Sequence, residues 1–145
     1  MKRIRLGVKD KNKEYIFRET CFGVVFKGGE FYVTEKDGEI SLIGGGVEKG
    51  ESHEETLRRE FMEEAGLEIV NIAPLITIDC YWHTKDSRDM NSLANFYIVD
   101  VDDRIFEPTE KQSKLVRIKK DEIISKLSLP YQIKAVEIFL SLAAG

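Results

Sequence analysis

Residues 45–67 read GGVEKGESHEETLRREFMEEAGL, and this stretch decides both the fold and the chemistry of the chain. A glycine-rich turn leads into a segment in which carboxylates recur every three or four residues. Seven acidic and three basic residues lie in it, so it alone accounts for the net charge of −4 of the 145 residues. Such a negative focus attracts cations and repels a bare phosphate. We therefore expect an anionic substrate to arrive with a metal ion.

The segment after the glycines is predicted to be a helix. Ser52 and Glu55 form a capping-box pattern, and Gly66 is the residue type that best tolerates the left-handed conformation after a helix. At the helical repeat, three carboxylates fall within an arc of roughly 100° beside an apolar stripe. These are Glu60, Glu63 and Glu64, and the stripe is Leu57, Phe61 and Ala65.

Carboxylates that lie close together on a helix repel one another. Like charges three or four residues apart each cost roughly 0.2–0.5 kcal/mol on an exposed helix, and burial would raise their pKa values. A divalent cation removes the repulsion, and the hard oxygen ligands favour Mg²⁺ or Mn²⁺ over zinc or copper. The alternative is a solvated acidic face. The preceding glycines argue against it, since they let backbone groups approach metal or phosphate closely, and so does Glu51, which we expect to pair with Arg59.

At this point the chain resembles the Nudix family. The matching positions are Gly45, Glu51, Arg59, Glu60, Phe61, Glu63, Glu64, Gly66 and Leu67, which fill every fixed position of the Nudix box. The resemblance implies an α/β/α sandwich, with a mixed sheet flanked by helices and the box as a loop–helix–loop motif. It also implies hydrolysis of a nucleoside diphosphate linked to another group, with Mg²⁺ or Mn²⁺ as cofactor. The run often found before the box has Trp and Pro where this chain has Ile40 and Ile43.

The resemblance also assigns roles to residues. Glu60, Glu63 and Glu64 would be metal ligands together with the carbonyl of Gly44. Glu51 and Arg59 would form the supporting pair. For the water-activating base, family members differ, so both Glu60 and a loop glutamate stay open. The loop candidates are Glu107 and Glu110, with Asp102 and Asp103 behind them.

Residues that select the substrate lie outside the box. Tyr81 and Trp82 could stack on a nucleobase, or they could be packing residues. Arg88, in the polar loop Thr84–Asn91, could meet an anionic substrate, or it could be solvated. Gly45 is the box residue expected to approach substrate.

Apolar runs predict strands at 4–8, 21–26, 31–34, 69–78, 93–101 and 115–118, helices from Ser52 and from Pro130, and a short helical turn near 121–127.

The length fits a single domain, residues 1–145. No apolar run approaches the ~20 residues that span a membrane. Two cysteines, Cys21 and Cys80, are too few for a disulfide scaffold, which favours the cytoplasm. A homodimer stays open, and the net charge argues against general nucleic-acid binding.

These features predict a Nudix pyrophosphohydrolase that acts on a small-molecule nucleotide diphosphate. A nucleoside triphosphate, as in MutT-type members, is the leading substrate class. Dinucleoside polyphosphates and nucleotide sugars stay open. The rival from another class is a non-catalytic, nucleotide-sensing Nudix module.

Overall fold

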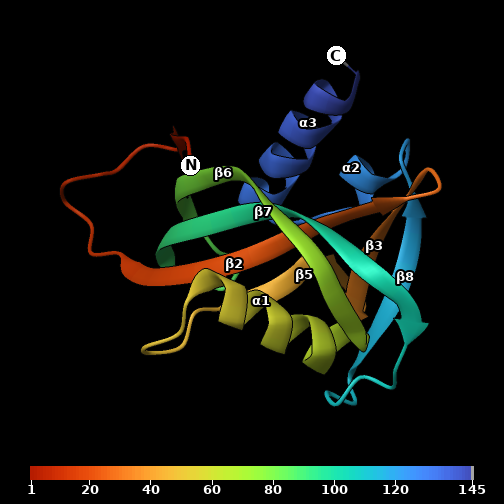
Figure 1. Cartoon of the computed structure of the whole chain (residues 1–145). Coiled ribbons are helices and arrows are strands. Elements are labelled where there is room, and N and C mark those ends of the chain that lie inside the picture. The colour runs from red at the N-terminus through yellow and green to blue at the C-terminus, as the bar shows by residue number, and fades with distance from the viewer. Residues whose placement is uncertain (145) are drawn as a thin grey trace.

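The computed structural model describes residues 1–144 and contains a mixed sheet with helices on both faces (Figure 1). Helix α1 lies against one face and α3 against the other. This is the predicted α/β sandwich. The strands are β1 (Arg3–Leu6), β2 (Ile16–Lys27), β3 (Glu30–Lys36), β4 (Glu39–Ser41), β5 (Ile43–Gly46), β6 (Leu67–His83), β7 (Asp89–Ile105) and β8 (Ser113–Lys119).

The long strand β2 joins two parts of the sheet. Its first part pairs in parallel with β7 and antiparallel with β5, while its last residues pair antiparallel with β3. Strand β1 lies parallel to β6 at one edge, and β3 also pairs with β4 and β8. The short strand β5, which the sequence did not predict, sets Gly45 opposite Cys21 and Gly46 opposite Thr20. The register of β5 therefore fixes where the box begins.

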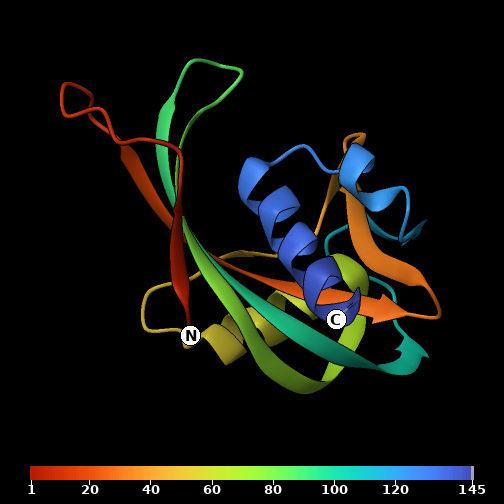
Figure 2. The ribbon, with the colours of Figure 1, turned by 90° about the horizontal axis from the view of Figure 1, so that it is seen from above.

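Strands β6 and β7 form a long hairpin that extends beyond the predicted strand limits. Each has 17 residues, and register shifts near Pro74 and Ile69 interrupt their pairing. The expected loop Thr84–Asn91 is shorter than predicted, because Asp89 and Asn91 already pair with His83 and Tyr81. Figure 2 shows this hairpin tip projecting from the body beside the N-terminal loop. An edge-to-face contact between Tyr15 and Tyr81 joins the two.

The box helix begins as the sequence predicts. Ser52 caps α1 (His53–Glu60), and the reciprocal hydrogen bonds with Glu55 complete the capping box. The last turn, Phe61–Ala65, is a π-helical turn, which local sequence patterns do not predict. Gly66 ends it with φ +65°, and a Cβ there would lie 1.9 Å from the carbonyl oxygen of Phe106. Glycine is thus required at this position for both backbone conformation and space.

Two apolar clusters hold the layers together. Under α1, the predicted stripe of Leu57, Phe61 and Ala65 is fully buried against β2, β6 and β7. On the other face, α3 (Pro130–Ala144) and the short α2 (Ile123–Lys126) cover a second cluster that includes Phe22 and Phe96. The sheet is therefore clamped between helices, and the box lies at its edge. Within residues 1–144, no helix combines the length and apolar character that crossing a membrane requires.

Candidate active site

Two glycines bring the sheet and the box carboxylates into contact. The backbone N–H of Gly44 donates to Oε1 of Glu64 over 3.2 Å. A Cβ on Gly45 would lie 2.7 Å from Oε1 of Glu60, closer than real Cβ atoms come. At Gly44, where φ is +153°, a Cβ would meet the carbonyl oxygen of Cys21 at 2.0 Å. Gly45 therefore leaves the space that the Glu60 carboxylate occupies, whereas Gly44 leaves space for strand β2.

Arg59 is the cation around which the box is organised. Its Nε and Nη2 donate to the two carboxylate oxygens of Glu51, over 2.6 and 2.9 Å. Nη2 also donates to the carbonyl of Gly46 over 3.1 Å, and Nη1 donates to Glu60 over 2.7 Å and Glu63 over 3.3 Å. Bidentate arginine–carboxylate pairs are among the strongest of such contacts. This pair ties the glycine turn to α1.

The environment of Glu51 keeps its carboxylate ionised. Hydrogen bonds from Arg59, then from the backbone N–H of Glu48 and the hydroxyl of Thr56, lower the pKa of Glu51 to about 2. The same contacts raise the pKa of the Arg59 guanidinium. The pair stays charged at any pH at which the protein is expected to work, so its geometry does not depend on titration.

The pKa of Glu64 is shifted in the opposite direction from that of Glu51. Burial, followed by the charge of Glu60, raises the pKa of Glu64 to about 8, although the N–H of Gly44 lowers it. A buried carboxylate beside another one lacks a counter-charge, which is the donor chemistry that a hard divalent cation satisfies. The side chain of Glu60 is only 13% exposed, whereas that of Glu63 is 42% exposed and accepts a hydrogen bond from Arg59.

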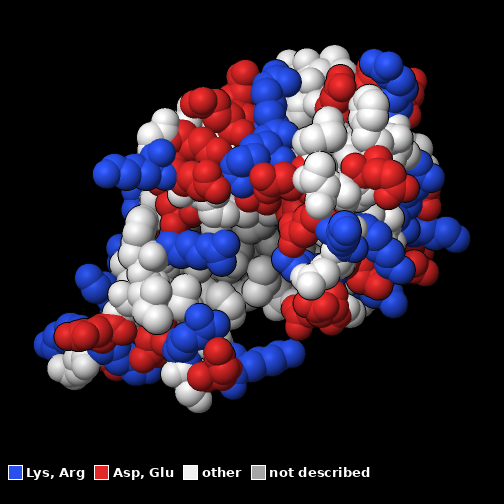
Figure 3. All heavy atoms as spheres, turned by 90° about the horizontal axis from the view of Figure 1, so that it is seen from below, with Lys and Arg blue, Asp and Glu red and all other residues white. Residues whose placement is uncertain are grey.

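These residues fit a divalent cation as partial ligands. Within residues 1–144, no three His, Cys, Asp or Glu side chains converge as a ready-made metal cage. Magnesium, however, commonly takes one or two carboxylates and completes its shell with water and substrate phosphates. Glu64 accepts the N–H of Gly44 and Glu60 lies against Gly45, so both carboxylates lie beside β5, while Glu63 is bonded to Arg59. Figure 3 shows acidic side chains gathered on this face beside a hollow.

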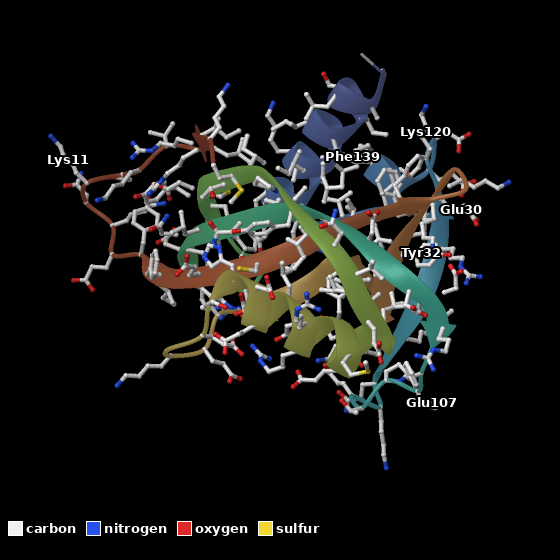
Figure 4. The ribbon with its side chains drawn as sticks, in the orientation of Figure 1. Lys11, Glu30, Tyr32, Glu107, Lys120 and Phe139 are labelled. Atoms are coloured by element: carbon white, nitrogen blue, oxygen red, sulfur yellow. The ribbon has the colours of Figure 1, made fainter. Side chains whose placement is uncertain are left out.

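Of the two loop glutamates, the structure brings Glu110 to the carboxylates. Its backbone N–H donates to the carbonyl of Glu63 over 2.8 Å, and its charge contributes to the raised pKa of Glu64. Lys36 at the end of β3 forms an ion pair with it. Glu107 is exposed and lies at the outer edge of the loop (Figure 4). The structure therefore supports Glu107 less than Glu110 as the water-activating base.

The aromatic residues expected at the substrate site lie on opposite faces of β6, because neighbours in a strand alternate. Tyr81 contacts the ring of Tyr15 and lies under the guanidinium of Arg5. Trp82 donates through Nε1 to Ser92 and packs edge-on against Tyr131. They do not form one stacking pair. Arg88 lies in the exposed hairpin turn, where it pairs with Asp86.

A buried glutamine, which the sequence did not single out, anchors the strand before the glycines. The side chain of Gln132 on α3 is fully buried. Its Oε1 accepts the backbone N–H of Leu42 over 2.9 Å, and its Nε2 donates to the hydroxyl of Ser41 over 3.0 Å. Ninety residues separate Gln132 from Leu42, so no local pattern could have indicated this contact. It holds the strand without the Pro that the family often has at position 43.

Comparisons with known proteins agree with this geometry. The family model described as NUDIX domain matches residues 18–130. The chain therefore belongs to the Nudix domain family, which confirms the predicted membership. The fold and the family place it among the Nudix hydrolases. A comparison with curated protein sequences gives no match.

Solved structures share the fold at low sequence identity. A NUDIX hydrolase from Nitrosomonas europaea superposes with a TM-score of 0.65 at 18% identity, over 86% of this chain and 88% of that one. A MutT protein from Bacillus halodurans gives 0.68 at 19% identity, over 83% and 80%. A protein described as an ADP compounds hydrolase gives 0.65 at 18% identity, over 88% and 74%. The predicted fold is thus confirmed.

Proposed function

We propose that this protein is a divalent-metal-dependent hydrolase of a phosphoanhydride bond in a nucleoside diphosphate linked to another group. The observation that carries the proposal is the packing of Glu60 and Glu64 against Gly44 and Gly45. Arg59 is already engaged with Glu51, and the charge of Glu64 lacks a partner. A bound Mg²⁺ or Mn²⁺ would polarise phosphoryl oxygens and offset the negative charge of substrate and carboxylates.

In this proposal the residues of the box have distinct tasks. Glu60, Glu64, Glu63 and the carbonyl of Gly44 would hold the cation. Arg59 orients Glu60, and Glu51 fixes Arg59, so the carboxylates are preorganised before substrate enters. Water attacks a phosphorus of the diphosphate bridge, and a carboxylate accepts its proton.

Glu60 is our first choice for the proton acceptor. It is nearly enclosed, and the Nη1–H of Arg59 leaves only part of its carboxylate free. Glu110 is the alternative, because its backbone is bonded to that of Glu63 and its side chain can exchange Lys36 for a water molecule. Substrate phosphates and cation would enter together, since the box repels a bare anion.

Nucleoside triphosphates are the leading substrate class, in keeping with the MutT names of similar structures. We further propose that the protein acts in the cytoplasm on small molecules. The free, buried thiols of Cys21 and Cys80 suit a reducing compartment.

The proposal is tested by a product-resolved hydrolysis screen. Nucleoside triphosphates, dinucleoside polyphosphates and nucleotide sugars are incubated with the protein and Mg²⁺ or Mn²⁺, and phosphate is distinguished from pyrophosphate. We expect turnover in one class and its loss in Glu64→Gln. The matched control is Glu54→Gln, an exposed carboxylate of the same helix paired with Arg58. Metal-dependent binding without turnover in any class would instead support the non-catalytic sensing module.

A further inference from the structure

Among residues 1–144, one arginine has neither a carboxylate partner nor an aromatic ring beneath it. The other arginines of residues 1–144 either pair with a carboxylate or lie over an aromatic ring. They are Arg3, Arg58, Arg59, Arg88 and Arg104 with carboxylates, and Arg5 and Arg117 over Tyr81 and Tyr32. Among the described residues, Arg18 makes neither contact and donates no hydrogen bond. An arginine that the fold does not use for itself is available to a ligand.

Arg18 lies at the glycine turn. Residues 17–19 of β2 lie beyond the last β5 pair, Thr20 with Gly46, and line one side of a hollow of about 580 Å³. The other side is the turn 46–51 of the box. A Cβ on Gly46 would lie 3.4 Å from Nη2 and 3.6 Å from Nε of Arg18. The guanidinium therefore lies over a residue that has no side chain to cover it.

Arg18 lies close along the chain of β5 to the residue that contacts Glu60. Gly45 faces Glu60 and the next residue, Gly46, faces Arg18. Successive Cα atoms lie about 3.8 Å apart and neighbours in a strand point to opposite faces, so the Glu60 carboxylate and the Arg18 guanidinium lie on opposite faces of β5, one residue apart along the strand. Burial raises the pKa of the Tyr131 phenol, and the charge of Arg18 acts against that rise, so the guanidinium also faces α3.

The hollow itself does not favour a bare anion, because Glu19, Glu48 and Glu51 also line it, with Lys49 as the other cation. All three acids have partners: Glu51 and Glu48 pair with Arg59, and Glu19 contacts His53 and Asn95. The planar guanidinium fork fits two oxygens of a phosphate. A substrate that the box already binds through one phosphate would gain affinity from a second phosphate that contacts Arg18. It would not have to bind in the hollow by that contact alone.

We propose that Arg18 binds a substrate phosphate adjacent to the one attacked at the box carboxylates. The inference rests on the proposed function, because it takes a nucleotide with a diphosphate bridge as the ligand. Arg18 would set the position of the bridge along β5 and thereby select which phosphorus is attacked. It is a substrate-binding residue outside the Nudix box.

The test compares Arg18→Gln and Arg18→Lys with wild type. The matched control is Arg117→Gln, which removes one positive charge over Tyr32, outside the site. For the triphosphate that wild type hydrolyses best, we expect Arg18→Gln to raise KM about 10- to 100-fold, as for hydrogen bonds to a charged group. We expect kcat to change less than about threefold. Arg18→Lys should lie between, because lysine keeps the charge but not the fork.

A second measurement separates this inference from the proposed function. Calorimetry with magnesium pyrophosphate measures anion binding without turnover, and Arg18→Gln should weaken it about 10-fold or more. Unchanged KM and pyrophosphate affinity in Arg18→Gln would overturn the inference while leaving hydrolysis intact. If wild type hydrolyses no nucleotide, the pyrophosphate titration alone decides. Absence of pyrophosphate binding by wild type would then overturn the inference too. Thermal unfolding confirms that the variants fold.

Discussion

Replacing Glu64 with glutamine should stabilise the metal-free protein at pH 8. In the folded chain, burial and the charge of Glu60 raise the pKa of Glu64 from 4.5 to about 8. A raised carboxyl pKa means that the folded state binds the proton more tightly than the unfolded state. The stability from this proton is fully present below pH 4.5 and is lost as the pH rises through 8. Glutamine cannot ionise, and its carbonyl can still accept the N–H of Gly44.

The magnitude follows from the shift. Each pKa unit corresponds to 1.36 kcal/mol, so the rise of the Glu64 pKa from 4.5 to about 8 gives an upper bound of about 5 kcal/mol. Glu60 shares the proton and the site can relax, so we expect Glu64→Gln to gain about 2 kcal/mol at pH 8. At pH 4.5 the variant and wild type should agree within about 0.5 kcal/mol.

The assay is urea unfolding in EDTA at pH 4.5, 6 and 8. Glu54→Gln serves as the control, because its exposed pair with Arg58 predicts an effect of at most about 1 kcal/mol at each pH. A saturating divalent cation should reverse the ranking, since wild type gains binding energy and Glu64→Gln gains less. Equal destabilisation by Glu64→Gln at every pH would refute the claim that Glu64 is a buried carboxylate without a counter-charge.

Three further predictions concern two other residues of the box and the loop that carries Glu107 and Glu110. Gly66→Ala should lose at least about 2 kcal/mol in urea unfolding, because alanine at φ +65° is strained and its Cβ would collide with the Phe106 carbonyl; a loss below 0.5 kcal/mol would contradict this. Arg59→Lys should reduce kcat/KM about 10- to 100-fold, because one ammonium cannot replace the five hydrogen bonds of the guanidinium, and wild-type kinetics would argue against an organising role. Glu110→Gln should lower kcat more than Glu107→Gln does, and the reverse order would exclude Glu110 as the loop base.

The parts of the fold set by neighbouring residues could be predicted from the sequence. The capping box at Ser52 and the left-handed Gly66 are local devices, and both helix limits follow from them. The apolar stripe that includes Phe61 also required only the helical repeat. The carboxylate arc was predictable for the same reason.

Features that depend on distant pairing could not be predicted. Strand β5 exists because β2 supplies its partner, and its four residues carry no strand pattern of their own. The hairpin of β6 and β7 extends through polar residues because each supplies the other's hydrogen bonds. Gln132 meets Leu42 across ninety residues, and Arg18 is notable only because every other arginine has a partner. Sequence shows such residues without showing what they face.

The central claim is that the box carboxylates direct water to a phosphoanhydride bond. The most direct measurement is hydrolysis of the best nucleotide substrate in H₂¹⁸O with Mg²⁺, followed by mass spectrometry of the products. The account predicts one ¹⁸O in one phosphate product per turnover, and a rate loss of at least about 100-fold in Glu60→Gln and Glu64→Gln. Turnover that survives both substitutions would contradict it.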